Sequence, residues 1–358
     1  MITAKFGGTA ITPRNLIYVK KIITPAHKRI VVSAVGKESP NDVKTTDLLE
    51  RYYIDGDEKY WDKIADKYRR LVSVNAIDAD ADEILYDAKS RARKFSRAYC
   101  MSLGEEISAK LVAAFLGFTY VEADSIVRFN SRGLAYKKTI AQMSKAFEGV
   151  DSIVTGGYYG MGKYGRQTFS RGGSDVTGAL CAVASDSTLY ENWTDVNGVC
   201  AANPALVSNV YTLPALSYAQ MRQLSYAGAE VLHPDAVLPV ERAGIPVKIG
   251  NFFNPDGSAT LVGYCRADDA VLSVAEKRRN GYFVTTVLHS MPLALILKVL
   301  AEYMENNLCT VNIADCNLCR DKVSLSEIKL NENTVIITTK VSVIKGLCKY
   351  FQSANCLG

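Results

Sequence analysis

The sequence predicts an α/β protein in which a mainly parallel sheet lies between helices, followed by a smaller α+β domain. Two observations carry this prediction. Over the first 260 residues, short β-branched segments alternate with longer segments of helical periodicity, the order expected of parallel βαβ units. Beyond residue 264 the pattern changes to a compact alternation of strands and helices. We therefore divide the chain into residues 1–263 and 264–358.

The expected strands share β-branched and aromatic residues bounded by turn-forming residues. After an opening strand that ends at Lys5, they cover residues 29–35, 118–124, 150–158, 187–196 and 245–250. Helical spacing of apolar residues covers residues 45–73, 104–117 and 174–185. In the tail we expect strands at 271–276, 282–288, 309–315 and 334–340, and helices at 292–306 and 342–353.

The composition excludes several classes of protein. Of 358 residues, 48% are hydrophobic and 22% are charged, as in ordinary globular proteins. Lys298 and Glu302 interrupt the longest apolar stretch, so no membrane span is expected, and no secretory leader is visible. A net charge of +5, spread along the chain, argues against a dedicated nucleic-acid-binding protein. We expect a cytoplasmic protein without a membrane or nucleic-acid partner.

Nine cysteines without regular spacing fit a reducing compartment better than a disulfide framework. Cys316 and Cys319 form the one close pair, with Cys309 just upstream. A zinc site would need a second pair or a histidine at ligand spacing, so free thiols are the more frequent explanation of such a pair.

Glycine-rich segments follow two of the expected strands. Lys5 is followed by Gly7, Gly8 and Thr9, and glycines at a strand end let backbone N–H groups approach phosphate oxygens. Such a glycine pair is also common in tight turns. Residues 154–166 contain five further glycines.

Two cations, Lys163 and Arg166, accompany those five glycines and would suit an anionic ligand. The segment matches no nucleotide-binding pattern, and a mobile loop is the alternative.

The segment "SRGGSD", residues 170–175, leads into an expected helix. Ser174 is a suitable residue for the helix cap and Asp175 for its first turn, but capping leaves Arg171 and the two glycines unexplained. Because an arginine can hold a carboxylate through two parallel hydrogen bonds, the segment indicates a site for an anionic ligand.

Eight segments, in this order, resemble the aspartate kinases of the amino acid kinase family. They are KFGGTA, VVSAVGK, TTDLL, SLGEEISAKL, TGGYYG, FSRGGSDVTGAL, ENWTDVNG and YAGAEVLHPDAVLPVERAGIPVKIGN. The resemblance implies the amino acid kinase fold for residues 1–263 and a shortened ACT-like regulatory domain for residues 264–358. It also implies that the γ-phosphoryl group of ATP is transferred, with Mg²⁺, to the β-carboxylate of L-aspartate, the first step toward lysine and threonine.

The same resemblance assigns roles to residues in the matching motifs. Lys5 would bind the transferring phosphoryl group and Asp175 would organise Lys5, as the catalytic residues. Glu105 would bind the α-amino group of the substrate and Arg171 its α-carboxylate. The full set of expected substrate-binding residues is Ser33, Thr46, Glu105, Tyr158, Arg171 and Ser174. The expected nucleotide-binding residues are Gly7, Gly8, Thr9, Thr194 and Asp195.

The expected chemistry needs no general base. A free aspartate side chain has a pKa of about 3.9, so it is already an ionised nucleophile at neutral pH. We therefore expect His27, His233 and His289 to be structural, and catalysis to rest on alignment and charge neutralisation.

Some residues depart from the family pattern, and other functions stay open. Ala10, Cys200, Ala205 and Glu230 replace the usual residues near the expected nucleotide contacts. One alternative is a related kinase with a different carboxylate substrate. Another is a non-catalytic, amino-acid-binding regulatory subunit, against which the retained Lys5, Glu105, Arg171 and Asp175 argue.

The tail of about ninety residues has room for roughly one ACT-like module. We expect it to bind an amino-acid effector, lysine or threonine. We also expect two chains to pair through its exposed strand edges as a homodimer.

Overall fold

The computed structural model describes residues 1–207, 209–229, 231–263, 272–280, 282–289, 296, 300, 325–331, 334–339 and 343–353. The chain divides into two compact units, Met1–Val196 with Asp235–Gly257 and Asn197–Pro234 with Ser258–Gly358. Glu230, the three cysteines 309, 316 and 319, the predicted strand 309–315 and most of the predicted helix 292–306 lie outside the described residues. The predicted boundary near residue 264 stays a prediction, because residues 264–271 also lie outside them.

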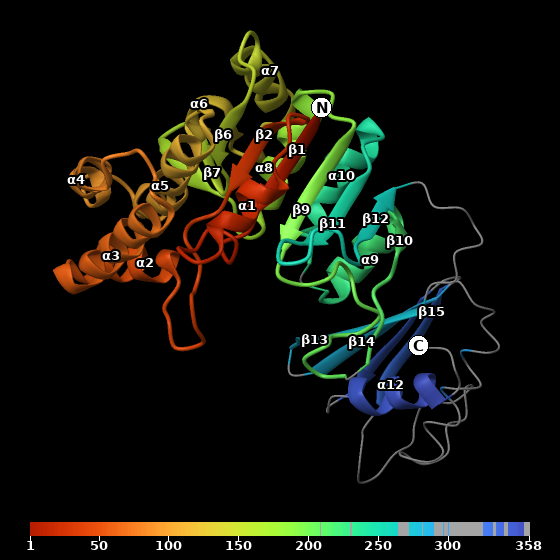
Figure 1. Cartoon of the computed structure of the whole chain (residues 1–358). Coiled ribbons are helices and arrows are strands. Elements are labelled where there is room, and N and C mark those ends of the chain that lie inside the picture. The colour runs from red at the N-terminus through yellow and green to blue at the C-terminus, as the bar shows by residue number, and fades with distance from the viewer. Residues whose placement is uncertain are drawn as a thin grey trace. The chain divides into compact units, whose positions relative to one another are not determined.

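A parallel sheet organises the first unit (Figure 1). Its strands follow the order β11-β9-β1-β2-β6-β3, and each neighbouring pair is parallel. The strands are β1 Ile2–Phe6, β2 His27–Val32, β3 Thr119–Tyr120, β6 Ile153–Gly156, β9 Leu189–Thr194 and β11 Val247–Asn251. Because the strands are parallel, their carboxyl ends meet at one edge of the sheet, which is the usual place for a ligand in such folds.

Helices connect and cover these strands. They are α1 Leu16–Ile22, α2 Thr45–Asp55, α3 Glu58–Asn75, α4 Ala81–Ala92, α5 Arg97–Leu116, α6 Ala123–Ile126, α7 Tyr136–Phe147, α8 Gly173–Ala184 and α10 Pro234–Ala243. The helix α5 is buried over most of its length, including the carboxyl-bearing residues Glu105 and Glu106.

Three predicted elements of this unit need correction. The single helix predicted at 45–73 is wrong, because Gly56 ends α2 with a left-handed φ of 70° and Asp57 caps α3 through the N–H of Lys59. The strand predicted at 118–124 is reduced to the two residues of β3, since α6 begins at Ala123. The alternative of a mobile loop for residues 154–166 is also wrong, because this segment contains most of an antiparallel hairpin, formed by β7 Tyr159–Gly162 and β8 Gly165–Thr168. A smaller hairpin precedes it, formed by β4 Phe129–Asn130 and β5 Gly133–Leu134.

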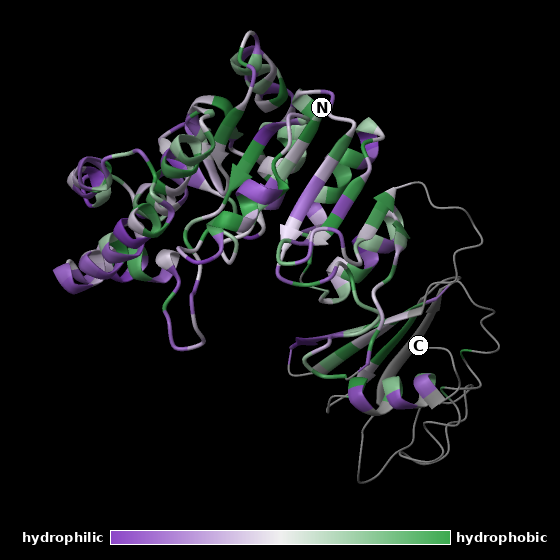
Figure 2. Ribbon diagram, viewed as in Figure 1, coloured by the Kyte–Doolittle hydropathy of each residue, from purple (hydrophilic) through white to green (hydrophobic). Residues whose placement is uncertain are grey.

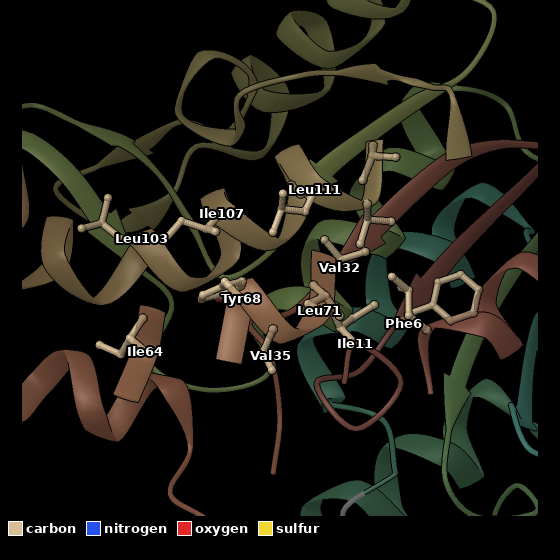
Figure 3. Close-up of a cluster of buried hydrophobic side chains, with 14 of the residues drawn as sticks. Phe6, Ile11, Val32, Val35, Ile64, Tyr68, Leu71, Leu103, Ile107 and Leu111 are labelled. Carbon is tan, nitrogen blue, oxygen red and sulfur yellow. The ribbon is translucent and has the colours of Figure 1, made fainter. Parts of the chain in front are cut away.

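The core of the first unit lies between the sheet and helices α2, α3 and α5. Figure 3 shows Phe6 of β1 and Val32 of β2 meeting Leu71 of α3 and Leu111 of α5 in one buried cluster. Figure 2 shows hydrophobic residues toward the carboxyl end of β2 and hydrophilic residues over much of α3. The core therefore fixes α5, which carries Glu105, against the strands that end in the other predicted site residues.

The second unit contains a small antiparallel sheet, which confirms the predicted α+β character of the tail. Its strands follow the spatial order β13-β14-β16-β15. Helix α12 Ile344–Ser353 follows β16 in the sequence. They are β13 Leu272–Arg279, β14 Tyr282–His289, β15 Leu325–Asn331 and β16 Thr334–Thr339, of which β15 was not predicted. The unit also contains the parallel strands β10 Ala215–Ser217 and β12 Thr260–Gly263, and helix α9 Tyr218–Ala227. Within the described part of the chain, no helix has the length and apolar character that crossing a membrane requires.

Candidate active site

The predicted site residues gather around the carboxyl edge of the parallel sheet. Lys5, Ser33, Tyr158 and Thr194 lie at or just beyond the ends of β1, β2, β6 and β9. The remaining predicted side chains come from α2, α5, α8, the loop before α8 and the segments that follow β1 and β9. The sheet edge thus brings together residues that are widely separated in the sequence.

A charged cluster occupies the centre of this edge. The Nζ atom of Lys5 lies 2.7 Å from Oδ1 of Asp175, and these side chains are only 12% and 13% exposed. The same Nζ donates a hydrogen bond to Oδ1 of Asn192 at 3.2 Å. Asn192 in turn donates from Nδ2 to Oδ1 of Asp175 at 3.5 Å. Lys5 is therefore a shielded cation whose position two other side chains determine.

Asn192 was not predicted as a site residue. It lies within the segment ENWTDVNG and is 1% exposed on the central strand β9. Asparagine is depleted in strands and rarely fully buried. An asparagine in a strand expected to be buried was therefore the signal that could have identified it.

The ends of β1 and β2 approach each other backbone to backbone. The N–H of Gly36 donates to the carbonyl of Gly8 at 2.9 Å, and a Cβ on Gly36 would lie 2.5 Å from that carbonyl oxygen. A Cβ on Gly8 would lie 2.8 Å from the carbonyl oxygen of Ala34. Only glycine fits at both positions. Ala10, where the family has serine, is fully buried in the core.

The start of α8 differs from the prediction. Gly172, with φ of 60°, is the N-cap residue and no side chain caps the helix, so the prediction that Ser174 caps it is wrong. Ser174 instead lies in the first turn and accepts a hydrogen bond from Ser33 Oγ at 3.0 Å. A glycine can adopt this left-handed conformation without strain. The hydroxyl of Ser174 is not used to cap the helix and instead faces the end of β2.

Tyr158 is one of the few residues other than glycine with a positive φ, 78°. Its carbonyl accepts a hydrogen bond from the N–H of Phe169 at 2.8 Å, which closes the β7–β8 hairpin. Partial burial raises the pKa of its hydroxyl, and the nearby Glu105 carboxylate adds to this effect. Strained backbone of this kind persists where the surrounding structure imposes it, often at functional sites.

Glu105 and Arg171 form no ion pair with any other side chain that the structure describes. Glu105 is 4% exposed, and its Oε2 has no hydrogen-bond partner in the described part of the chain. Burial raises the pKa of Glu105 to about 8, against the opposing effect of backbone hydrogen bonds. Arg171 is exposed in the loop before α8, and no ion pair among the described residues involves it. A buried polar atom without a partner costs free energy, so Glu105 is suited to a ligand that carries a cation.

The other predicted residues take peripheral positions. Thr194 donates to Asp195 at 3.2 Å, and Asp195 is exposed just beyond β9. Thr46 is half-buried in the first turn of α2, beside Thr45, which is buried and donates to the carbonyl of Val35 at 2.7 Å. Cys200 and Ala205 belong to the second unit.

The expectation that Arg166 is a cation for an anionic ligand is wrong. Its side chain is 3% exposed and lies 2.6 Å from Glu106, 2.7 Å from Asp124 and 3.2 Å from Glu122. Its charge is therefore already compensated within the protein, whereas Lys163 is exposed. Among the residues that the structure describes, no group of three or more His, Cys, Asp or Glu side chains is arranged to hold a metal ion.

A family model described as the amino acid kinase family matches residues 1–251. The chain belongs to the amino acid kinase family. Among the curated relatives of this amino acid kinase, aspartokinase 3 of Bacillus subtilis (strain 168) is 35% identical over 288 residues, covering 73% of the chain and 63% of the relative. The lysine-sensitive aspartokinase 3 of Escherichia coli (strain K12) is 29% identical over 245 residues, covering 64% of the chain and 52% of the relative. The chain thus spans less than two thirds of the length of these relatives.

Solved structures confirm the predicted fold of this amino acid kinase. The aspartate kinase of Clostridium acetobutylicum superposes with a TM-score of 0.73 at 28% identity, covering 99% of the chain and 82% of that structure. Escherichia coli aspartokinase III in complex with aspartate and ADP superposes with a TM-score of 0.68 over 100% of the chain and 84% of that structure. At 21% identity, the second likeness concerns the fold alone.

Proposed function

We propose that this amino acid kinase is an aspartate kinase, which transfers the γ-phosphoryl group of ATP to the β-carboxylate of L-aspartate and releases ADP and 4-phospho-L-aspartate. The observations that carry the proposal are the shielded Lys5–Asp175 pair, the buried Glu105 carboxyl, whose Oε2 has no hydrogen-bond partner among the described residues, and the exposed Arg171, which makes no ion pair with them. An α-amino acid presents an ammonium group and a carboxylate to such residues. The relatives named aspartokinases support the same substrate.

Substrate binding would use both charges. Glu105, buried and lacking a partner at Oε2, would accept hydrogen bonds from the α-ammonium group. Arg171 would donate two parallel hydrogen bonds to the α-carboxylate. The side-chain carboxylate would then be the one group of aspartate left to react, and it is ionised at neutral pH without a general base.

Phosphoryl transfer would depend on Lys5. Its ammonium group, held by Asp175 and Asn192, would donate to oxygens of the transferring group and offset the repulsion between two anions. Because its partners already fix its position, little reorganisation is needed when the reaction occurs. Backbone N–H groups of Gly7, Gly8 and Thr9 and the side chains of Thr194 and Asp195 would contact the nucleotide.

Mg²⁺ is part of the proposal. In nucleotide-dependent enzymes this ion binds through one or two carboxylates together with phosphate oxygens. Asp175 and Asp195 are the carboxylates near the ends of β1 and β9, so the residues present fit an ion that is held mainly by the nucleotide. When bound, Mg²⁺ neutralises charge on the phosphoryl group.

We further propose regulation by lysine or threonine through the second unit, a homodimer formed through it, and a cytoplasmic location. A relative described as lysine-sensitive and a structure of Escherichia coli aspartokinase III with lysine and aspartate support an amino-acid effector. The four-stranded sheet ends in β13 and β15, whose outer edges suit pairing between two copies.

The deciding experiment traps the acyl phosphate. The purified chain is incubated with MgATP and L-aspartate in the presence of hydroxylamine, with L-glutamate as a parallel substrate. Aspartyl hydroxamate formed by the native chain and absent with Lys5→Ala would support the proposal. Product formed with glutamate alone would show that the substrate is a carboxylate other than aspartate. No product with either substrate would favour a non-catalytic binding protein.

A further inference from the structure

Lys67 of helix α3 is a buried lysine outside the site described above. Its Nζ donates a hydrogen bond to the carbonyl oxygen of Gly36 at 3.3 Å and pairs with the carboxylate of Asp42. Both partners belong to residues 36–44, the loop that leads from the end of β2 into α2. Lysine is rarely buried unless its charge is paired. These contacts therefore account for the position of Lys67, and they attach the 36–44 loop to α3.

The carboxylate of Asp42 holds the 36–44 loop together. Its Oδ2 accepts a hydrogen bond from the N–H of Glu38 at 3.0 Å, and its Oδ1 accepts one from the N–H of Val43 at 2.7 Å. Burial opposes the charge of Asp42, but hydrogen bonds from Lys67 and from the backbone of Glu38 hold its pKa below the ordinary value. Asp42 is therefore ionised at neutral pH, with Lys67 as its counter-ion.

Gly36 connects Lys67 to the glycine segment Gly7–Thr9. Its N–H donates to the carbonyl oxygen of Gly8 at 2.9 Å, while its own carbonyl accepts from Lys67. The two glycines are in close backbone contact, because a Cβ on Gly36 would lie 2.5 Å from the carbonyl carbon and oxygen of Gly8. The position of Gly8 therefore depends on that of Gly36, which Lys67 supports from the other side.

A second ion pair joins the same loop to the same helix. Nη2 of Arg70 lies 2.8 Å from Oε2 of Glu38, and the side chain of Arg70 is 53% exposed. An exposed pair of this kind contributes little to stability. Among the contacts that the structure describes for Arg70, none is with Gly36. This pair therefore allows a general attachment of the loop to α3 to be distinguished from the support of Gly36.

We propose that Lys67 is a positioning residue for the nucleotide: by holding Gly36, it keeps the backbone of Gly8 where its N–H can bind a phosphate oxygen. This inference rests on the proposed function, in which residues Gly7–Thr9 contact ATP. Backbone N–H groups form an anion site only when successive groups converge on the ligand, so a small displacement of one glycine weakens binding. If Lys67 only stabilised the fold, folded variants would keep native nucleotide affinity.

The test measures the binding of MgADP by isothermal titration calorimetry, which requires no turnover. Lys67→Met should raise the Kd for MgADP roughly 3- to 10-fold, the loss expected of about one hydrogen bond, and KM for ATP should rise by a similar factor. KM for aspartate should change less, because Thr45 anchors the start of α2 separately, by donating to the carbonyl of Val35 at 2.7 Å. Arg70→Met is the matched control and should bind MgADP as the native chain does.

The double variant Lys67→Met/Asp42→Asn guards against misfolding, because Lys67→Met alone leaves the Asp42 carboxylate without its counter-ion. It should fold and show the same loss of MgADP affinity. Native affinity in folded Lys67 variants, or an equal loss in Arg70→Met, would overturn the inference. If the native chain binds MgADP but does not phosphorylate aspartate, the proposed function fails, and the binding comparison still decides the role of Lys67.

Discussion

Gly157 packs directly against Ser174: a Cβ added to Gly157 would lie 2.5 Å from the Cα and 2.6 Å from the Oγ of Ser174. Gly157 directly follows strand β6, and Ser174 lies in the first turn of helix α8. The glycine therefore sets how closely α8 approaches the sheet. The hydrogen bond from Ser33 to Ser174 depends on the same approach.

Gly157→Ala should therefore displace the start of α8. We expect a loss of about 1–3 kcal/mol in the free energy of unfolding, typical of overpacking, and a lower kcat/KM for aspartate. Urea unfolding measures the first effect. Gly7→Ala is the control for stability, since its Cβ would meet the nearest atom, Lys5 Nζ, at an ordinary 3.7 Å. Equal stability of the two variants would contradict the steric argument.

Lys5→Met should lower kcat by roughly 10²- to 10³-fold, as for the loss of one preorganised donor to a developing charge. The hydroxylamine assay measures this loss, and circular dichroism checks that the variant is folded. Lys137→Met removes an exposed lysine of α7 and should retain native kcat. A Lys5→Met variant with native turnover would exclude Lys5 from catalysis.

Arg171→Ala should raise KM for aspartate by roughly 10- to 100-fold, because hydrogen bonds to charged groups contribute about 1.5–3 kcal/mol. KM for ATP should not change. Initial rates at varied aspartate and fixed saturating ATP provide the measurement, with the exposed Arg132→Ala as control. Unchanged aspartate kinetics would refute a contact between Arg171 and the substrate.

Glu105→Gln should alter how stability depends on pH. The folded pKa of Glu105, about 8, lies above the ordinary value near 4.3, so the unfolded chain releases this proton first as pH rises. Burial of Glu105 therefore costs stability increasingly above about pH 4.3, at up to roughly 1.4 kcal/mol per pH unit, and the cost levels off above about pH 8.

Urea unfolding of native protein and Glu105→Gln at pH 5 and pH 8 checks this prediction. The variant should gain in stability relative to native protein as the pH rises between these values. The exposed Glu148→Gln should show no such trend. A difference between Glu105→Gln and native protein that is the same at both pH values would show that the carboxyl is not buried as described.

The sequence was sufficient for the parallel sheet, because buried parallel strands leave long β-branched runs between helices. The sequence was not sufficient to predict that Arg166 is buried among carboxylates. A cation beside glycines has the same appearance whether it faces a ligand or a buried carboxylate, and its partners Asp124 and Glu106 are 42 and 60 residues away. The helix break at Gly56 was missed although it has a local signal, a glycine that ends α2 followed by Asp57, which caps α3.

The position of β1 also has a consequence for synthesis of the protein. β1 pairs with β2 on one edge and with β9 on the other, and 187 residues separate Lys5 from Asn192. During translation, the second edge of β1 has no partner until β9 leaves the ribosome, at about 5–20 residues per second. Lys5 is thus made among the first residues and acquires its final surroundings only after more than half of the chain has been made, so a nascent chain that stalls before β9 presents an open strand edge to chaperones or to other nascent chains.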